Sequence, residues 1–340
     1  MFNSKVPTYY LPLALGAGLL IAILGSGFIG RGEANQPVKL VNNAAERVCE
    51  TKITQIDGYR NIRPLLSSEP LCESPRYSAM KDGLQGLIQS MKNDGVLTEA
   101  SVYVRDFRKG EWTAVNGNVM YEPGSLMKVP LLMTYLRMAE KDPAVMSKKF
   151  SVRAGTQSPK FNFFPPSASI EPGKSYEVNE LLDYAIRKSD NMAVVALLQH
   201  VDIAQFHRTY TDLGLRDFKD SDPSYPSNVN ECSTFFKALY NSTYLSIDDS
   251  ELAISFLMGS EFDQGIKAGL PAGTPVANKF GEAGDGTGLQ LHETALVYAG
   301  QDPYLITVMT KGPIMEALPG TIAAISRLVY AEMMRMRGAS

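Results

Sequence analysis

The sequence predicts an α+β protein in which an antiparallel sheet is flanked by N- and C-terminal helices and carries an inserted all-helical lobe. Two observations lead to this fold class. Short β-rich segments occur near residues 101–117 and again after Gly273, while the chain from residue 126 to 258 has mainly helical periodicity. Strands at both ends of a domain can complete one antiparallel sheet, which leaves the helical stretch as a second lobe.

A third observation adds an N-terminal transmembrane helix ahead of this domain. A run of about 22 uncharged residues extends from Tyr9 to Gly30, between Lys5 and Arg31. As a helix it has a length of roughly 33 Å, enough to cross a hydrocarbon core of about 30 Å. The length of the run, and the poor cleavage site in "GRGEANQ", favour an uncleaved anchor over a signal peptide. We therefore expect a membrane-anchored protein with an extracytoplasmic domain, periplasmic or at the cell surface, or a secreted one if the segment is cleaved.

Composition excludes some classes of function and leaves one question open. The formal net charge is −3, and no stripe of clustered Lys and Arg suggests a nucleic-acid partner. With three Cys, three His and no CxxC or HxxxH spacing, we expect no metal site and no cofactor. Cys49 and Cys72 could form a disulfide outside the cytoplasm or remain two free thiols, whereas Cys232 has the pattern of a small buried side chain.

The elements follow in order along the chain. Residues 32–77 are polar and rich in turn residues, which indicates a linker. Apolar residues from Met80 to Met91 follow helical spacing until "NDG" ends the run, and "SVYVRDF" and "EWTAVNG" form an antiparallel hairpin. The domain boundaries that we predict are 1–31 for the anchor or signal segment, 32–77 for the linker and lead-in, 78–120 with 266–340 for the sheet lobe, and 121–265 for the helical lobe.

The remaining elements complete the two lobes. Helical patterns include "NELLDYAIRK", "NMAVVALLQHV" and "ECSTFFKALYNS", with the proline-rich connector "SPKFNFFPPSASIEPGKSY" ahead of them. Strands return in "TPVANKFG", "TGLQLHETALVYAG" and "PYLITVMTKG", and a final helix covers about 319–336. Pockets form preferentially between lobes, so we expect chemistry where the helical block meets the sheet.

The stretch "YEPGSLMKVPLL" brings a serine and a lysine together at the start of an apolar helix. "EPG" delays the helix, so Ser125 is expected at its N-terminus, where free backbone N–H groups and the helix dipole can stabilise an oxyanion. Lys128 falls on the same face and can hydrogen-bond the Ser125 hydroxyl. Among apolar neighbours its amine is partly desolvated, which lowers its pKa and makes it a proton acceptor. The alternative is an ordinary cap serine and a solvated lysine.

Two further motifs follow in order. In "RKSDNMAVV", the residues Ser189, Asp190 and Asn191 precede an apolar helix and, taken alone, have the composition of an ordinary N-cap. In "PVANKFGEAGDG", Lys279 lies on a predicted strand, where a lysine is usually a solvated edge charge. An ordered set of S-x-x-K, S-D-N and K-x-G in these structural contexts is far more specific than any one of its members.

With these motifs the chain resembles the penicillin-recognising serine hydrolases, most closely the class A β-lactamase branch, over about residues 78–337. The resemblance implies that Ser125 is the nucleophile and Lys128 the general base or part of a proton relay. It further implies that Ser189 passes a proton to the leaving nitrogen and that Lys279 supplies positive charge to Ser189 and to a substrate carboxylate.

The resemblance also implies a substrate-binding set. Asn191 would hold the side-chain amide of the substrate, and the backbone N–H groups of Ser125 and Glu282 would form the oxyanion hole. Phe280 and Gly281 belong to the third motif, and Tyr121 is expected to line the cleft.

Two departures from the family pattern affect these expectations. Phe280 stands where the family has Thr or Ser, so the hydroxyl that contacts the substrate carboxylate is missing. The loop that should supply a deacylating glutamate contains no E-x-x-L-N pattern. The candidates that replace this glutamate are Asp217, Asp220, Asp222 and Glu231.

We therefore expect a serine hydrolase that forms an acyl-enzyme at Ser125 with a β-lactam or a peptidoglycan-like peptide, anchored to the membrane by its N-terminal helix. Deacylation is the weak step of this hypothesis. The alternative is a catalytically silent protein on the same fold that binds cell-wall peptides or a partner protein. A purely structural membrane-proximal domain is a third interpretation. His200, His207 and His292 are interpreted as structural.

Overall fold

The computed structural model describes residues 49–338, except 57, 59, 154–155, 157–162, 218–224, 286–287 and 301–302. The predicted anchor, Tyr9–Gly30, lies outside the described residues. Within them, no helix combines the length and the apolar character that crossing a bilayer requires. The membrane anchor therefore stays a prediction.

A five-stranded antiparallel sheet joins the two ends of the domain, as predicted. Its strand order is β4-β3-β9-β8-β7. The strands are β3 (Glu99–Asp106), β4 (Glu111–Val115), β7 (Val276–Asp285), β8 (Gly288–Val297) and β9 (Tyr304–Gly312). The predicted hairpin β3–β4 pairs through β3 with β9, where Val102 is opposite Val308. The sheet is thus completed by the C-terminal part of the chain.

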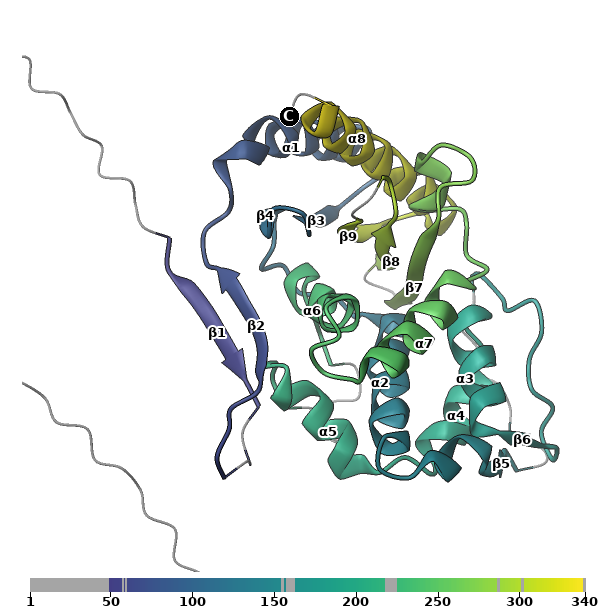
Figure 1. Cartoon of the computed structure of the whole chain (residues 1–340). Helices are drawn as coiled ribbons and strands as arrows, with labels where there is room; N and C mark the ends of the chain where they lie inside the picture. Colours follow the sequence, from purple (N-terminus) through teal and green to yellow (C-terminus); the bar gives the residue numbers. More distant parts are fainter. Residues whose placement is uncertain are drawn as a thin grey trace, which may run out of the picture. The chain divides into compact units, whose positions relative to one another are not determined.

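Two helices cover one face of this sheet (Figure 1). They are α1 (Ser78–Asn93) and α8 (Leu318–Gly338), close to the bounds that the periodicity predicts. Met80, Leu84 and Ile88 of α1 recur at helical spacing and are buried in one core cluster with apolar residues of α8 and the sheet. This layer holds the two termini of the domain together.

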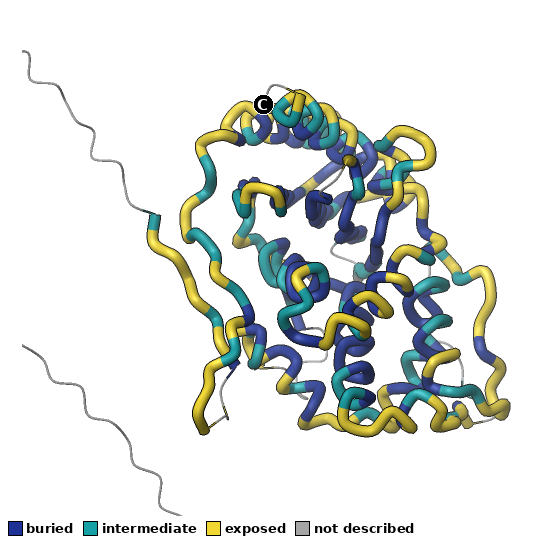
Figure 2. The backbone as a smooth tube through the Cα atoms, in the orientation of Figure 1, coloured by how far each residue is buried: buried dark blue, intermediate teal, exposed yellow. Residues whose placement is uncertain are grey.

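The helical block covers the opposite face (Figure 1). It contains α2 (Lys128–Ala139), α3 (Val178–Arg187), α4 (Asn191–Leu198), α5 (Ile203–Asp212), α6 (Val229–Tyr240) and α7 (Ile247–Met258), with a small sheet of β5 (Lys149–Ser151) and β6 (Ser175–Glu177). Helix α2 is buried on nearly every side, and its tube is dark along most of its length in Figure 2. A helix packed in this way gives the residues at its N-terminus fixed positions.

The prediction of a linker is wrong over residues 49–72, where the chain forms a two-stranded arm. Strand β1 (Thr51–Gln55) pairs antiparallel with β2 (Leu65–Pro70), and a disulfide joins Cys49 to Cys72 at the base of the arm. The disulfide decides between the two alternatives for this cysteine pair. The strands were missed because they are mostly exposed and polar, so their sequence lacks the alternation that marks a half-buried strand.

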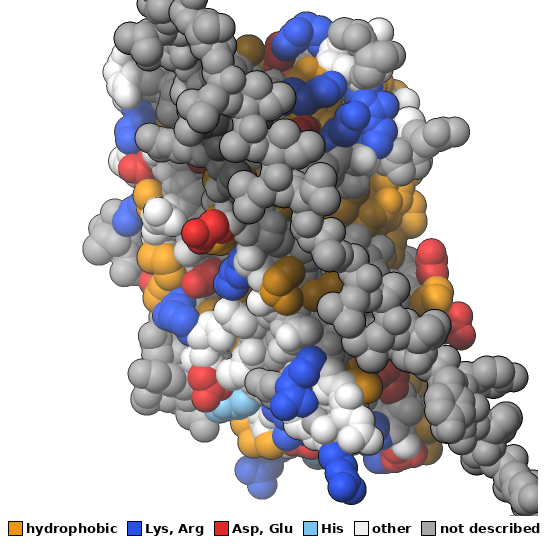
Figure 3. All heavy atoms as spheres, turned by 60° about the vertical axis from the view of Figure 1, so that its left-hand side comes forward, with side chains coloured by type: hydrophobic (Ala, Val, Ile, Leu, Met, Phe, Trp, Pro, Cys, Tyr) orange, Lys and Arg blue, Asp and Glu red, His pale blue; other side chains and the backbone are white. Residues whose placement is uncertain are grey.

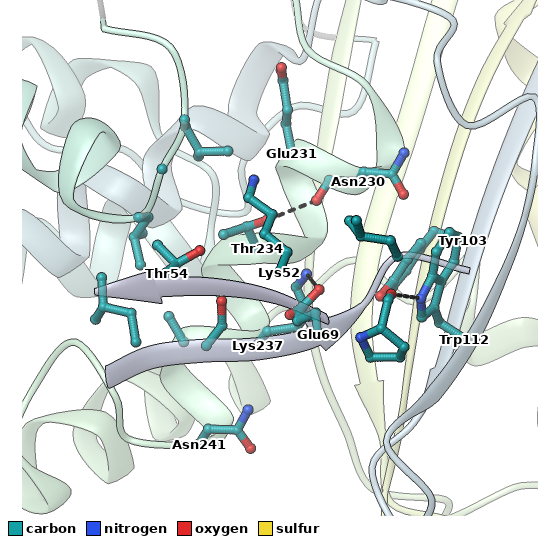
Figure 4. Close-up of a pocket in the computed structure, with 18 of the residues that line it drawn as sticks. Lys52, Thr54, Glu69, Tyr103, Trp112, Asn230, Glu231, Thr234, Lys237 and Asn241 are labelled. Carbon is teal, nitrogen blue, oxygen red and sulfur yellow. Dashed lines mark hydrogen bonds and ion pairs between the residues drawn. The ribbon is translucent and has the colours of Figure 1, made fainter. Parts of the chain in front are cut away.

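The arm is attached to α6 and to the sheet by a few polar contacts and by the buried side chain of Leu66. Figure 4 shows Lys237 of α6 reaching Glu69 of the arm, with Nζ and Oε2 2.8 Å apart. The indole N–H of Trp112 donates to the carbonyl oxygen of Pro70 at 2.8 Å. A cavity of about 410 Å³ remains between the arm and α6.

On the face seen in Figure 3, Lys and Arg side chains occur together with Asp and Glu, separated by hydrophobic and other polar groups. Charges of both signs on one face give little net attraction for a polyanion.

The ion pair between Glu69 and Lys237 is expected to contribute to the stability of the domain by holding the arm against α6. Glu69→Ala leaves the nearly buried Lys237 amine without its carboxylate, so we expect the free energy of unfolding to fall by about 2–3 kcal/mol. Urea unfolding followed by circular dichroism measures it. Lys174→Ala removes an ion pair that is exposed on both sides and is the matched control, with no expected change of midpoint. Equal effects of the two substitutions would contradict this account of the arm.

Candidate active site

Ser125 lies in a short 3₁₀ turn, Gly124–Met127, directly ahead of α2, which begins at Lys128. The predicted position of the serine at a helix N-terminus is therefore confirmed, with one tight turn inserted before the α-helix. Gly124 has φ of +53°, a left-handed conformation that glycine adopts without strain. The Ser125 side chain is partly exposed, whereas that of Lys128 is buried.

Strand β7 passes so close to this turn that only glycine fits at the contact. A Cβ atom on Gly281 would lie 2.2 Å from the carbonyl oxygen of Pro123 and 3.0 Å from the backbone nitrogen of Ser125. On the other side, a Cβ atom on Gly124 would lie 2.3 Å from the carbonyl oxygen of Glu282. The two glycines therefore bring the backbone of Glu282 against the turn that carries Ser125.

The Ser189 hydroxyl is held between two lysine amines. Lys279 Nζ donates to Ser189 Oγ at 2.9 Å, and Lys128 Nζ lies 3.2 Å from the same oxygen. Ser189 is the middle residue of the three that link α3 to α4 and has φ of +59°, which turns its side chain out of the helical path. The structure thus brings together the three sequence motifs at one hydroxyl group.

The other hydrogen bonds of Lys128 also go to the second motif. Its amine donates to the carbonyl oxygen of Ser189 at 2.7 Å and to Oδ1 of Asn191 at 2.8 Å. Among the hydrogen bonds of the described residues, none joins this amine to the Ser125 hydroxyl. The expected Ser–Lys hydrogen bond is therefore absent in this arrangement, and the amine instead fixes the turn of the second motif.

Asp190 is the structural member of the second motif. Its carboxylate accepts from the backbone N–H groups of Met192 and Ala193 and so caps α4. It also accepts from the hydroxyl of Ser169 at 2.6 Å and from the backbone N–H of Ile170 at 2.9 Å. The side chain is buried and ties the proline-rich connector to the turn that presents Ser189 and to the start of α4.

Burial changes the protonation of both lysines. It lowers the pKa of Lys128 to about 7, although the nearby carboxylates of Asp190 and Glu282 favour the charged amine. Burial also holds the pKa of Lys279 well below its ordinary value, and the charge of Lys128 lowers it further. A neutral amine that can accept a proton is therefore accessible near neutral pH, without a histidine.

Phe280 covers the Lys279 amine with its ring. The distance from Lys279 Nζ to the centre of the ring is 4.3 Å. The ring stacks on Phe262 at a centroid distance of 4.3 Å, and Phe164 meets it edge-on at 6.0 Å. Sequence reasoning missed Phe164 and Phe262, because only the folded chain brings the connector, the segment after α7 and strand β7 together.

The side chain of Glu282 lies on the same connector. Its Oε2 atom accepts from the backbone N–H groups of Phe163 and Phe164 at 3.0 and 3.3 Å. Burial raises the pKa of this carboxyl, opposed by these two N–H groups and by the charges of Lys128 and Lys279. The residue that we expected to contribute its backbone N–H therefore also places an acidic group beside the aromatic cluster.

Tyr121 has a different environment from the one expected. Its ring is buried and meets His292 edge-on, with centroids 5.2 Å apart, and its hydroxyl is 2.9 Å from that of Ser101. His292 is itself fully buried, 3.0 Å from the carbonyl oxygen of Glu122, and burial lowers its pKa to about 3. These contacts account for both side chains within the core, and we assign neither a role in the reaction.

Two of the four candidates for the deacylating acid, Asp217 and Glu231, lie within the described residues. Asp217 pairs with His207 at 3.0 Å, and Glu231 with Arg216 at 3.6 Å. Asp220 and Asp222 lie outside the described residues. No group of three or more His, Cys, Asp or Glu able to hold a metal occurs in the described part of the chain.

Comparisons with known proteins identify the family and the fold of the chain. The family model described as "Beta-lactamase enzyme family" matches residues 81–333. No curated protein matches the chain. Among solved structures, PBP-A is similar with a TM-score of 0.63 and 17% identity over 76% of this chain and 97% of that one. A mutant of PBP-A, solved as an acyl-enzyme complex with penicillin G, has a TM-score of 0.64 at 17% identity, covering 78% of this chain and 100% of that one.

A class A β-lactamase from Mycobacterium abscessus is similar with a TM-score of 0.62 and 20% identity over 75% of this chain and 99% of that one. At such identities these structures show a shared fold. The family model extends from α1 almost to the end of α8 and contains all three motifs. The chain belongs to the β-lactamase enzyme family, a family of β-lactamase-like serine hydrolases.

Proposed function

We propose that this protein is a serine hydrolase that forms an acyl-enzyme at Ser125. The observation that carries the proposal is the position of the Ser189 hydroxyl. It lies within hydrogen-bond distance of the amines of both Lys279 and Lys128, and Lys128 is only three residues beyond Ser125. Serine and lysine pairs of this kind activate a hydroxyl nucleophile without a histidine.

In the proposed reaction, Ser125 Oγ attacks the carbonyl carbon of the substrate while Lys128 takes the hydroxyl proton. The carbonyl oxygen becomes an oxyanion and accepts from the backbone N–H groups of Ser125 and Glu282. Collapse of this intermediate breaks the carbon–nitrogen bond. Ser189 delivers a proton to the leaving nitrogen and receives in exchange the proton that Lys128 took from Ser125, since the Lys128 amine lies 3.2 Å from Ser189 Oγ. The buried amine of Lys279 orients the Ser189 hydroxyl for this step.

The substrate class is the carbonyl of a β-lactam or of a peptidoglycan-like peptide. The similar PBP-A mutant was captured as an acyl-enzyme with penicillin G, which supports a lactam as a first ligand to test. We assign Asn191 to a substrate amide, because its side chain lies beside Lys128 at the start of α4. A membrane anchor at Tyr9–Gly30 would hold this domain outside the cytoplasm.

Hydrolysis of the acyl-enzyme is the slow step of the proposed cycle. Deacylation needs a base that orients water, and two of the four candidates, Asp217 and Glu231, are paired with basic side chains. A protein with this arrangement is acylated once and releases the acyl group slowly. In this respect it resembles a penicillin-binding protein more than an antibiotic-destroying enzyme.

A second candidate function is binding of cell-wall peptides or a partner protein without catalysis. The observation that favours it is the Lys128 amine, which donates to Ser189 and Asn191. Catalysis requires the amine to exchange one of these bonds for the Ser125 proton. A binder would retain saturable affinity for wall fragments and would form no covalent bond.

Acylation predicts a mass increase that depends on one hydroxyl group. Incubation with benzylpenicillin or its methyl ester is expected to add one acyl group to the protein, measured by intact-protein mass spectrometry. Ser125→Ala abolishes the adduct, whereas Ser90→Ala, on the surface of α1, does not. An adduct that persists in Ser125→Ala, or no adduct from either lactam, would rule out the proposed nucleophile.

The pKa of Lys128 predicts how acylation depends on pH. Only the neutral amine accepts a proton, so the rate rises about tenfold per pH unit at low pH and levels off above about 7. The rate of adduct formation is measured by mass between pH 5 and 8.5. Lys128→Arg keeps a permanent charge and is expected to slow acylation by about 10²–10⁴-fold at every pH. A rate of the unaltered protein that does not change with pH would contradict the assignment of the base.

The paired acidic candidates predict a long-lived acyl-enzyme. After removal of free lactam, the adduct is expected to persist for hours, and its mass is followed over that time. Asp217→Asn and Glu231→Gln should leave the rate of adduct loss unchanged, since each carboxylate is held by another side chain. Loss within seconds that either variant slows would show that one of these acids is the deacylating base.

A further inference from the structure

The ring of Phe280 lies against the amine of Lys279, the lysine of the third motif. Lys279 is fully buried, and its amine donates to Ser189 Oγ at 2.9 Å and to the carbonyl oxygen of Phe280 at 3.0 Å. The Phe280 ring lies 4.3 Å from the same amine. Because Lys279 is fully buried and this ring lies against its amine, a substrate carboxylate does not reach the cation in this arrangement.

Aromatic and proline residues form the surface next to Phe280. Phe280 stacks on Phe262, and both rings contact Phe164 edge-on. These residues line a cavity of about 460 Å³, together with Phe163, Pro165 and Pro166. Ser167, Glu261 and Gln264 line the cavity as well, so it is the aromatic wall beside Phe280 that favours an apolar group of a ligand, because burying an unpaired charge against it is costly.

The two basic residues that line the same cavity already have acidic partners. Lys188 Nζ is 2.6 Å from Glu261 Oε1, and Arg187 Nε is 2.9 Å from Asp183 Oδ1. Neither the Lys188 amine nor the Arg187 guanidinium therefore offers an uncompensated charge to an incoming carboxylate.

An acidic group stands on the same side of the strand. Glu282 follows Phe280 by two positions, so both side chains lie on one face of β7. The Glu282 carboxyl binds the backbone N–H of Phe164, whose ring contacts Phe280. A second carboxylate placed here would meet an apolar ring and a group of its own sign.

From these contacts we infer that the site selects acyl donors with an uncharged, apolar group on the Phe280 side of the scissile bond, and discriminates against donors with a carboxylate there. The inference rests on the proposed function for the identity of the scissile bond. The substrate class is neutral lactams and neutral amides or esters. The rings of Phe280, Phe262 and Phe164 contact the apolar group of such a substrate.

Two matched ligands test this selectivity. Benzylpenicillin and its methyl ester differ in a single group, a carboxylate in one and a neutral ester in the other. We expect the methyl ester to acylate the protein at least about tenfold faster, measured from the adduct mass at equal concentrations.

Substitutions at Phe280 show whether the ring causes the preference. Phe280→Thr removes the cover of Lys279 and supplies a hydroxyl, so the ratio of the two rates should move at least about tenfold toward the carboxylate. Phe280→Leu keeps an apolar side chain without a hydroxyl and should retain preference for the ester. Far-ultraviolet circular dichroism of each variant confirms that it is folded.

A binding measurement separates this inference from the proposed reaction. In Ser125→Ala, which lacks the nucleophile, the dissociation constants of the same two lactams are measured by isothermal titration calorimetry. Tighter binding of the methyl ester by about tenfold supports the inference even if the unaltered protein forms no adduct, a result that would overturn only the proposed function. Equal or tighter binding of benzylpenicillin, or the same ratio in Phe280→Thr, overturns the inference.

Discussion

Two buried lysine amines lie within hydrogen-bond distance of one hydroxyl group, that of Ser189. Two positive charges so close to a common oxygen repel each other in an environment of low polarity, and burial alone already disfavours each charge. The arrangement is therefore compatible with a neutral amine at Lys128 near pH 7 and a pKa of Lys279 far below its usual value. Burial of Lys128 thus supports its proposed role as the proton acceptor, a role that needs no histidine.

The fold provides the rigidity that this arrangement needs. Helix α2 is buried along most of its length, so its first residue, Lys128, has little freedom to move. Gly124 and Gly281 allow the turn before this helix and strand β7 to touch backbone to backbone. Asp190 fixes the turn that carries Ser189, because its carboxylate caps α4 and binds the connector. Three segments that are distant in sequence thus share one site, because two of them are anchored in the helical block and the third in the sheet.

The sequence was sufficient for the parts of the structure that repeat a local pattern. Helix α1 and the sheet follow from apolar periodicity, and the three motifs predicted which segments meet. The arm could not be predicted, because its strands are held by the disulfide and by single contacts such as Glu69 with Lys237, which leave no periodic trace. The aromatic cluster around Phe280 was also out of reach, since its members come from three separate segments. The hydrogen bonds of Lys128 depend on side-chain geometry that spacing alone does not specify.

Direct titration of the Lys128 amine tests the central claim, that burial lowers its pKa to about 7 and so makes the neutral amine available at neutral pH. In protein labelled with ¹³C at lysine Cε, the Lys128 signal is assigned by its loss in Lys128→Arg and followed by NMR between pH 5 and 11. The account predicts a midpoint at about 7. A midpoint near the ordinary lysine value of about 10.4 would contradict it, because the amine would then be charged at neutral pH and unable to accept the Ser125 proton.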